Sequence, residues 1–263
     1  MSIAAESETH ATARLRTLSV SKSFQKDGRS FDAIRDVALH VNVNEFVSII
    51  GPSGCGKSTL FNIIAGLEVP DKGTVEVSGV DMTGRPEACA FMPQKDLLFP
   101  WRNIIDNTIL GLQIAGMSKA EARRKVAPYF ATFGIDGTQH LYPFQLSGGM
   151  RQRAALLRTV VQGRQVLLLD EPFGALDSLT RADMQDWLLR VWQAERWAVI
   201  LVTHDIREAV YLSDRVYVMT KSPGRILDVI DIDLPRPRGA EVVELPEFAV
   251  YEARLAHALR GHD

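Results

Sequence analysis

Cysteine, long apolar runs and an excess of one charge sign are all scarce in this sequence of 263 residues. Its two cysteines, Cys55 and Cys89, are too few for a disulfide framework, so a reducing compartment is the simpler interpretation. The longest apolar runs, at 166–169 and 198–202, are far shorter than the roughly 20 residues that cross a bilayer. If such a chain serves a membrane, it does so through a partner.

The charge balance also narrows the classes of function. With 30 Lys plus Arg against 32 Asp plus Glu, the formal net charge is −2, whereas bulk binding to nucleic-acid phosphates leaves a basic imbalance. A nearly neutral net charge is still compatible with a local basic patch on the surface. Residues 1–16 contain no apolar run, so we expect no signal peptide. The apolar content of 46% is enough for one large domain or a domain with a subdomain.

Apolar patterning predicts a chain that mixes strands and helices. Residues 14–24 and 31–43 combine alternating and short apolar stretches, as in strands of an N-terminal antiparallel sheet. Unbroken runs at 166–169 and 199–202, with a helix expected between them over 178–196, are typical of central strands in a parallel sheet covered on both faces. Further strands are expected at 45–50, 74–77 and 88–91, and a further helix at 57–67.

Helical periodicity dominates between about residues 96 and 161. Ser118 and Glu121 form a capping-box pattern, which predicts a helix from there through Phe133. Residues 234–239 are interpreted as a break before a tail. Within that tail, the spacing of apolar residues over 246–260 predicts a short amphipathic helix.

A glycine-rich loop at 51–59, Gly-Pro-Ser-Gly-Cys-Gly-Lys-Ser-Thr, fits the phosphate-binding pattern. Glycines let backbone N–H groups turn toward phosphate oxygens, Lys57 brings a positive charge to the β- and γ-phosphates, and Ser58 offers a hydroxyl to Mg²⁺. The helix that follows points its positive end at the anion. Cys55 is either a small filler of the loop or a reactive thiol. The predicted nucleotide contacts are Gly51, Pro52, Ser53, Gly54, Cys55, Gly56, Lys57, Ser58 and Thr59.

Two apolar runs end in polar residues. Asp170 and Glu171 follow the first run, and His204 follows the second. Open parallel sheets bind ligands beyond the carboxyl ends of their strands, so these side chains are expected to meet the phosphate loop there. Asp170 could then hold Mg²⁺, Glu171 could polarise an attacking water, and the imidazole could contact the γ-phosphate. Taken alone, an Asp-Glu pair could equally open a loop and cap a helix.

The segment Leu-Ser-Gly-Gly-Met at 146–150 resembles the signature of ABC ATPases, and further motifs follow that family's order over about residues 15–234. Met150 departs from the glutamine that many members carry. Phe24 is similar to the family's aromatic residue that stacks on adenine. The other matches are residues 51–59 with Walker A, Gln94 with the Q-loop, Asp170 and Glu171 with Walker B and the catalytic glutamate, residues 175–177 with the D-loop, and His204 with the switch histidine.

The resemblance implies an α/β fold, namely a P-loop NTPase (RecA-like) core with an N-terminal antiparallel β-subdomain and an inserted α-helical subdomain. The ATPase domain would span residues 14–234, with the helical part at about 96–162 and a tail at 235–263. The implied cofactors are ATP and Mg²⁺. The implied catalytic residues are Lys57, Gln94, Glu171 and His204, and the implied Mg²⁺ residues are Ser58, Gln94 and Asp170.

The signature has a role that can be argued from its residues. Ser147, Gly148 and Gly149 come at the expected start of a helix, where a hydroxyl and free N–H groups form an anion site. In the family this site faces the γ-phosphate held by another subunit. We therefore expect two copies of the chain to clasp ATP between them.

Within the family, runs at 142–153, 171–177, 222–226 and 234–238 are similar to those of nitrate, sulfonate and taurine importer ATPases. Such a subunit would lie peripherally on the cytoplasmic face of the inner membrane. It would bind permease subunits directly and an extracytoplasmic solute-binding protein indirectly, without nucleic acid. The apolar segment after Gln94, at 98–101, is expected to meet the permease.

Other members of the family remain as alternatives. An ABC-type ATPase of DNA repair or chromosome organisation usually carries long coiled coils or zinc modules inserted in the fold. Here Lys57 and Ser147 are 90 residues apart (147 − 57), with no heptad arm and no Cys cluster between them. Translation factors of the family carry two ATPase domains, and exporters commonly fuse the ATPase to a membrane domain.

Overall fold

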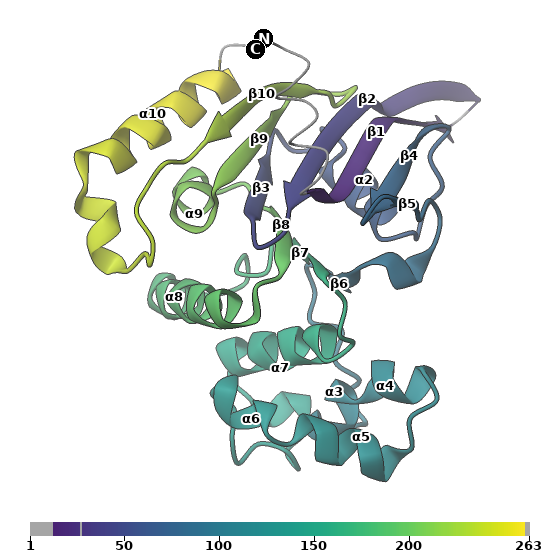
Figure 1. Cartoon of the computed structure of the whole chain (residues 1–263), viewed down its shortest axis with the longest axis vertical. Helices are drawn as coiled ribbons and strands as arrows, with labels where there is room; N and C mark the ends of the chain where they lie inside the picture. Colours follow the sequence, from purple (N-terminus) through teal and green to yellow (C-terminus); the bar gives the residue numbers. More distant parts are fainter. Residues whose placement is uncertain (1–12, 27, 261–263) are drawn as a thin grey trace.

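Two β-sheets form the centre of the computed structural model, which describes residues 13–26 and 28–260 (Figure 1). The expectation that the chain has no signal peptide concerns mainly residues 1–12, which lie outside the described residues. No helix in the described part of the chain is both long enough and apolar enough to span a membrane.

The smaller sheet is antiparallel and has the order β2-β1-β4-β5. The strands predicted at 14–24, 31–43 and 74–77 are confirmed within it. A register shift occurs between Thr17 and Val20, in the middle of β1. The strands are β1 (Ala13–Lys26), β2 (Arg29–Asn42), β4 (Lys72–Val77) and β5 (Val80–Asp81).

The larger sheet has the order β10-β9-β3-β8-β7-β6, and its strands are parallel except for β10. Side chains of β8 alternate between two cores: Val199 and Leu201 pack into one, and Ile200 and Val202 into the other. The expected parallel sheet covered on both faces is thus confirmed, although β9 and β10 had not been predicted. The strands are β3 (Phe46–Ile50), β6 (Ala90–Met92), β7 (Val166–Asp170), β8 (Ala198–Val202), β9 (Arg215–Met219) and β10 (Ile226–Asp231).

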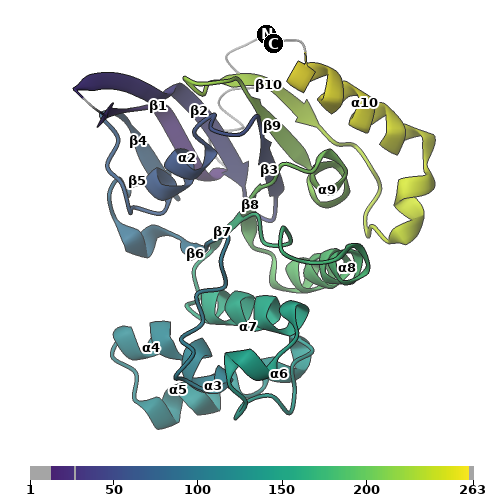
Figure 2. The same cartoon turned by 180° about the vertical axis from the view of Figure 1, so that it is seen from behind.

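Helix α2 (Lys57–Ile64) lies between the two sheets, as Figure 2 shows. Its side chains Leu60, Phe61 and Ile63 are fully buried in a core shared with the antiparallel strands and one face of the parallel sheet. The helix ends earlier than predicted, because Gly66 adopts φ +71° and terminates it. This packing fixes the phosphate loop, which leads into α2, against both sheets.

The helices of the inserted subdomain, α3–α7, lie together at one end of the molecule (Figure 1). The predicted helix from Ser118 to Phe133 is wrong in its length. The Ser118 hydroxyl does accept the N–H of Glu121, but the helix breaks near Pro128, which has no N–H to continue the ladder. The helices are α3 (Ile104–Thr108), α4 (Leu110–Ile114), α5 (Lys119–Val126), α6 (Tyr129–Thr132) and α7 (Gly148–Val160).

Helices α8 (Ser178–Glu195), α9 (Ile206–Leu212) and α10 (Pro246–Arg260) cover the remaining face of the parallel sheet. The helix predicted at 246–260 is α10, which packs on α9 through the buried side chains of Phe248 and Leu255. Short 3₁₀ turns occupy Pro86–Ala88, Pro143–Gln145 and Ala240–Glu244.

The segment between β10 and α10 is fastened to the core by a buried arginine. Arg238 is 5% exposed, and its guanidinium donates to three carbonyl oxygens at the end of α9 and two after β10. These bonds satisfy carbonyls that the end of a helix leaves without partners. The acceptors are the carbonyl oxygens of Val210, Tyr211, Ser213, Ile232 and Leu234.

Arg238→Met is therefore expected to lower the free energy of unfolding by about 3–5 kcal/mol, since it strands several buried acceptors. Urea denaturation of the purified chain measures this loss. Arg254→Met, at an exposed position of α10, is the matched control and should cost less than about 0.5 kcal/mol. Equal losses in the two variants would show that the carbonyl groups find other partners.

Candidate nucleotide-binding site

The glycine-rich loop connects β3 to α2 in a conformation that depends on glycine. Gly56 has φ +99°, and a Cβ there would lie 2.5 Å from Ile34 Cγ2 and 2.6 Å from the carbonyl oxygen of Ala33. Lys57 is 9% exposed, and its Nζ donates to the carbonyl oxygen of Gly51 at 2.7 Å. The ammonium group thus lies over the loop, within the region that the sequence assigns to phosphate.

Cys55 lies inside this loop with 1% of its surface exposed. Its Sγ is 3.6 Å from Nζ of Lys57, and a Cβ on Gly51 would come within 2.9 Å of the same sulfur. The thiol therefore fills the interior of the loop, which agrees with the small-filler interpretation rather than the reactive one.

A cavity of about 620 Å³ opens at the carboxyl ends of β3, β7 and β8. It brings together the predicted adenine-stacking residue, most of the glycine-rich loop and the polar residues from three other segments. Open parallel sheets bind ligands at this edge, and Glu171 and His204 meet the loop there as expected, whereas Asp170, Pro52 and Cys55 do not line the cavity. The predicted residues that line it are Phe24, Gly51, Ser53, Gly54, Gly56, Lys57, Ser58, Thr59, Gln94, Glu171 and His204.

Three polar side chains meet on one wall of the cavity. The amide of Gln94 donates from Nε2 to Oε2 of Glu171 at 3.0 Å, and Nδ1 of His204 lies 3.4 Å from Oε1 of the same carboxylate. The imidazole is 67% exposed and the Glu171 side chain 22%. The three residues come from different strand ends, so the parallel sheet assembles them. A water between such groups would be oriented by a carboxylate acceptor and two polar neighbours.

The backbone at Glu171 is constrained. The residue has φ +44°, a left-handed conformation that costs energy for a side chain other than glycine, and its N–H donates to the carbonyl oxygen of Val202 at 2.9 Å. The bond ties the turn after β7 to the end of β8. Such a strained turn persists because its surroundings determine it, and here it aims the carboxylate into the cavity.

Asp170 ends β7 one residue earlier and is partly buried. Burial raises the pKa of its carboxyl to about 6, the charge of Glu171 adds to this, and Lys57 opposes it. No group of three or more His, Cys, Asp or Glu side chains that could hold a metal occurs among the described residues. Mg²⁺ usually takes one or two protein ligands together with phosphate oxygens and waters. The Ser58 hydroxyl and the Asp170 carboxylate fit that pattern.

The signature residues do not line this cavity. Ser147 is the N-cap of α7, and its exposed hydroxyl accepts the N–H of Met150 at 3.3 Å. Gly149 is buried at the start of the same helix, where a Cβ would come within 2.9 Å of Thr180 Cγ2. The residues predicted to form an anion site therefore lie at a capped helix start, outside the cavity that contains the phosphate loop of the same chain.

Sequence reasoning missed part of the cavity wall. Phe31 pairs with Phe24 across β1 and β2, with ring centroids 5.9 Å apart, and Ser222 lines the cavity from the loop after β9. Phe31 is 46% exposed, which is large for an aromatic side chain. An apolar residue near a predicted hairpin was the available signal, but the strand register needed to use it was unknown.

A buried carboxyl lies on α9, the helix that follows His204 in the sequence. Glu208 of α9 is 6% exposed; its Oε2 accepts the Thr203 hydroxyl at 2.7 Å, whereas its Oε1 has no partner among the described residues. Burial raises the pKa of Glu208 to about 7, and the nearby carboxylates of Asp205 and Glu171 add to this.

This carboxyl is expected to make stability depend on pH. Between the ordinary value of 4.5 and about 7, the native state holds a proton that the unfolded state has lost, so the free energy of unfolding falls as pH rises. Glu208→Gln removes the titration. Its unfolding free energy relative to wild type should rise by about 2–3 kcal/mol from pH 5 to pH 8. Urea titrations at several pH values test this, with exposed Glu247→Gln as a control that shows no such trend.

The fold and the cavity together define a P-loop nucleoside triphosphatase. The sequence matches the ABC transporter family over residues 34–174, and the chain belongs to that family. It is an ATPase subunit that binds ATP, related to the ATP-binding proteins of importers.

Three relatives span most of this chain. The chain is 47% identical to a formylaminopyrimidine import ATP-binding protein of Halalkalibacterium halodurans, with 74% of this chain and 76% of the relative covered. It is 42% identical to an aliphatic sulfonates import ATP-binding protein of Bacillus licheniformis, with 82% and 84% covered. It is 38% identical to a nitrate import ATP-binding protein of Synechocystis, with 88% and 89% covered.

A solved structure supports the same conclusion about the fold. The dimeric structure of a bacterial ABC transporter cassette aligns with a TM-score of 0.73 at 28% identity, covering 86% of this chain and 99% of that chain. The expected α/β fold, with its antiparallel subdomain and inserted helices, is therefore confirmed.

Proposed function

We propose that this chain powers an ABC importer as one of two copies, which bind ATP between them beneath separate permease subunits. The observation that carries the proposal is the separation within one chain of the triphosphate cavity from the capped signature helix. A second copy, arranged head to tail, would bring Ser147 to the cavity of the first. The dimeric cassette that this chain resembles supports such an arrangement.

The residues of the nucleotide cavity have separate roles in the proposed hydrolysis of ATP. Lys57 and the loop N–H groups hold the triphosphate, and Phe24 with Phe31 offers aromatic faces to the base. Glu171 accepts a proton from the attacking water, while His204 holds the γ-phosphate end of the site. When bound, Mg²⁺ would neutralise charge on the phosphates, with the Ser58 hydroxyl, Gln94 and the Asp170 carboxylate around it.

An apolar surface follows Gln94 and would meet the permease. Leu97 is 58% exposed and Trp101 71%, with the Trp101 ring stacked on Phe99 at 5.1 Å between centroids. Arg158 of α7 donates to the carbonyl oxygens of Asp96 and Leu97, which ties this surface to the helix that begins with the signature. A movement of this surface would thus be transmitted to Glu171 through Gln94, and to the signature through Arg158 and α7.

The names of the relatives support a proposal for the solute and for the cellular setting. Their names cite nitrate, aliphatic sulfonates and formylaminopyrimidine, and we favour a small anion such as nitrate, a sulfonate or taurine. The subunit would lie on the cytoplasmic face of the inner membrane, with a solute-binding protein outside. The DNA-repair alternative has no support in the fold, because the longest described helix between Gln94 and Asp170 is α7, with 13 residues.

Photo-crosslinking from position 101 tests the proposal. A benzophenone amino acid in place of Trp101, in the full chain expressed in its own cell, should give an adduct with a polytopic membrane protein identified by mass spectrometry. The same amino acid at Val250, an exposed apolar position on α10, is the control and should give none. Adducts with DNA-bound or ribosomal proteins from position 101 would reject the importer in favour of the alternatives.

A further inference from the structure

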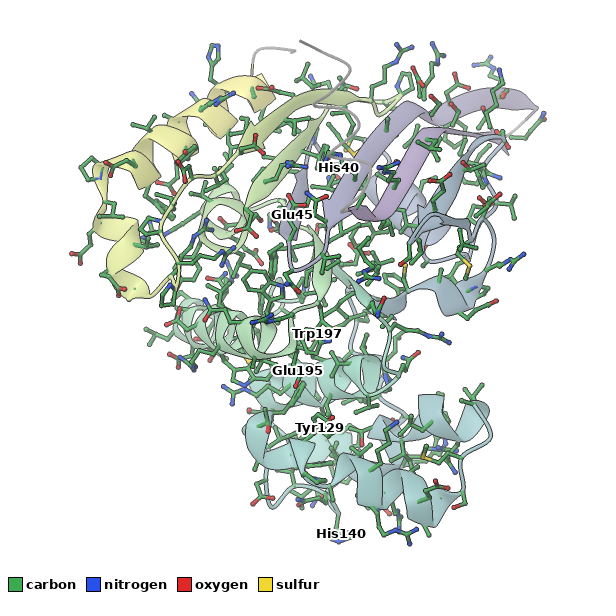
Figure 3. All side chains as sticks on the ribbon, in the orientation of Figure 1. His40, Glu45, Tyr129, His140, Glu195 and Trp197 are labelled. Carbon is green, nitrogen blue, oxygen red and sulfur yellow. The ribbon has the colours of Figure 1, made fainter. Side chains whose placement is uncertain are left out.

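A second cavity, of about 420 Å³, lies at the opposite edge of the parallel sheet from the nucleotide cavity. It begins where β7 and β8 begin, and its other wall comes from α5 and α6 of the helical subdomain. We call it the basal cavity. Figure 3 labels three of its residues, Tyr129, Glu195 and Trp197, which lie on the same side of the molecule between the helical subdomain and the sheet. Its volume falls within the roughly 300–1,000 Å³ typical of small-molecule sites.

The charge around the basal cavity is one-sided. Four cationic side chains line it, those of Arg14, Lys125, Arg164 and Arg196, against the single carboxylate of Glu195. Arg14 donates to the hydroxyl of Ser78, whereas Lys125, Arg164 and Arg196 form no ion pair or side-chain hydrogen bond with any described residue. Four cations beside one carboxylate leave the lining with a net positive charge, although Lys125, Arg164 and Arg196 are exposed to solvent, and a bound anion would neutralise part of that charge.

Several cations elsewhere in the molecule are paired with carboxylates. Asp106 holds both Lys119 and Arg123, at 2.8 and 2.6 Å, and Arg215 lies 2.8 Å from Asp231. Carboxylates are thus available to neutralise basic groups in this fold. Among the residues that line the basal cavity, Glu195 is the single carboxylate beside four cations.

The backbone beneath these cations is held in place. Arg196 caps α8 in a left-handed conformation, with φ +58°, and its N–H donates to the carbonyl oxygen of Trp192. Arg164 lies in the turn between α7 and β7, where the N–H of Gly163 and the carbonyl of Gln165 are both hydrogen-bonded. Left-handed residues other than glycine are costly and gather at functional sites. Fixing the backbone before binding also lowers the entropy lost on binding.

Aromatic side chains supply the rest of the wall. Trp197 and Tyr129 are half-buried on opposite sides, and Phe133 is buried behind them. The Trp197 indole N–H and the Tyr129 hydroxyl have no hydrogen-bond partner among the residues that the structure describes. Flat faces with free donors beside guanidinium groups suit a ring that carries a negative charge.

We propose that the basal cavity binds a small organic anion, one in which a planar ring carries a phosphate, sulfonate or carboxylate group. The ring lies against Trp197 and Tyr129, and the anionic group meets Arg164 and Arg196. This site is independent of the proposed transport reaction, since it shares no residue with the nucleotide cavity. Because one wall belongs to the helical subdomain and the other to the sheet, the ligand bridges these two parts.

Fluorine NMR of the full chain labelled with 5-fluorotryptophan tests the proposal with phenyl phosphate as the probe. Trp197→Phe assigns the Trp197 resonance, and Trp101, exposed elsewhere, is the internal reference. Phenyl phosphate should shift the Trp197 signal saturably. Inorganic phosphate at equal ionic strength and benzyl alcohol, which carries the ring alone, should shift it at least about tenfold less effectively.

Charge reversal supplies the matched comparison. Arg164→Glu with Arg196→Glu should weaken phenyl phosphate binding at least about tenfold, whereas Lys72→Glu with Arg190→Glu, the same change at exposed positions outside the cavity, should leave it unaltered. A Trp197 signal that phenyl phosphate does not move would overturn the proposal. So would equal binding in the two double variants, or an equal response to inorganic phosphate or to benzyl alcohol.

Discussion

Glu171→Gln is expected to lower ATP turnover by about 10²–10⁴-fold while ATP binding is retained. The carboxylate is the one acidic side chain that lines the nucleotide cavity among the described residues, and it accepts the Gln94 amide at 3.0 Å. Glutamine keeps the size and the polar contacts of this side chain but cannot take a proton from water. Phosphate release measures turnover, and equilibrium binding of a fluorescent ATP analogue measures affinity.

The control for this prediction is Glu87→Gln, the same substitution at an exposed position outside the cavity, which should hydrolyse ATP at the wild-type rate. If Glu171→Gln turns over ATP within a few-fold of the wild-type rate, Glu171 is not the general base. His204, which is 3.4 Å away, would then be the next candidate.

Much of the nucleotide cavity could be predicted because its parts are local in the sequence. The Gly-rich loop carries its own conformational requirement at Gly56, and Lys57 follows it directly. Asp170, Glu171 and His204 each follow a buried run. The strands of a parallel sheet end at the same edge. The position of these polar residues directly after buried apolar runs therefore predicted that they lie near the loop. The pairing of Glu171 with Gln94 needed side-chain geometry that no pattern contains.

The parts that could not be predicted depend on contacts between distant segments. The capping signal at Ser118 was correct, but it says nothing of where a helix ends, and Pro128 ended it early. Arg238 lies in a run interpreted as a break before a tail, yet it is buried against α9. The residues that line the basal cavity come from several separate segments of the sequence. Their positive charge therefore could not be recognised in a chain whose net charge is nearly zero.

Ser147→Arg carries the largest expected effect on assembly. In a Glu171→Gln background, ATP should drive the chain into a dimer, and adding Ser147→Arg should weaken that dimer on the order of 100-fold, because a bulky group would occupy the place of the γ-phosphate contact. Affinity for ATP in the monomer should be unchanged, since Ser147 lies outside the cavity of its own chain. Sedimentation velocity with and without ATP measures the dimer.

Ser118→Arg in the same background is the matched control. Ser118 and Ser147 are both exposed N-cap serines whose hydroxyl accepts an N–H at 3.3 Å, so either substitution removes one cap, worth about 1 kcal/mol, and adds one positive charge. Only position 147 begins the helix proposed to face the other copy. If both variants form dimers equally well, the signature lies outside the interface. If neither does, the loss of a cap explains the result, and the two copies do not share the triphosphate through Ser147.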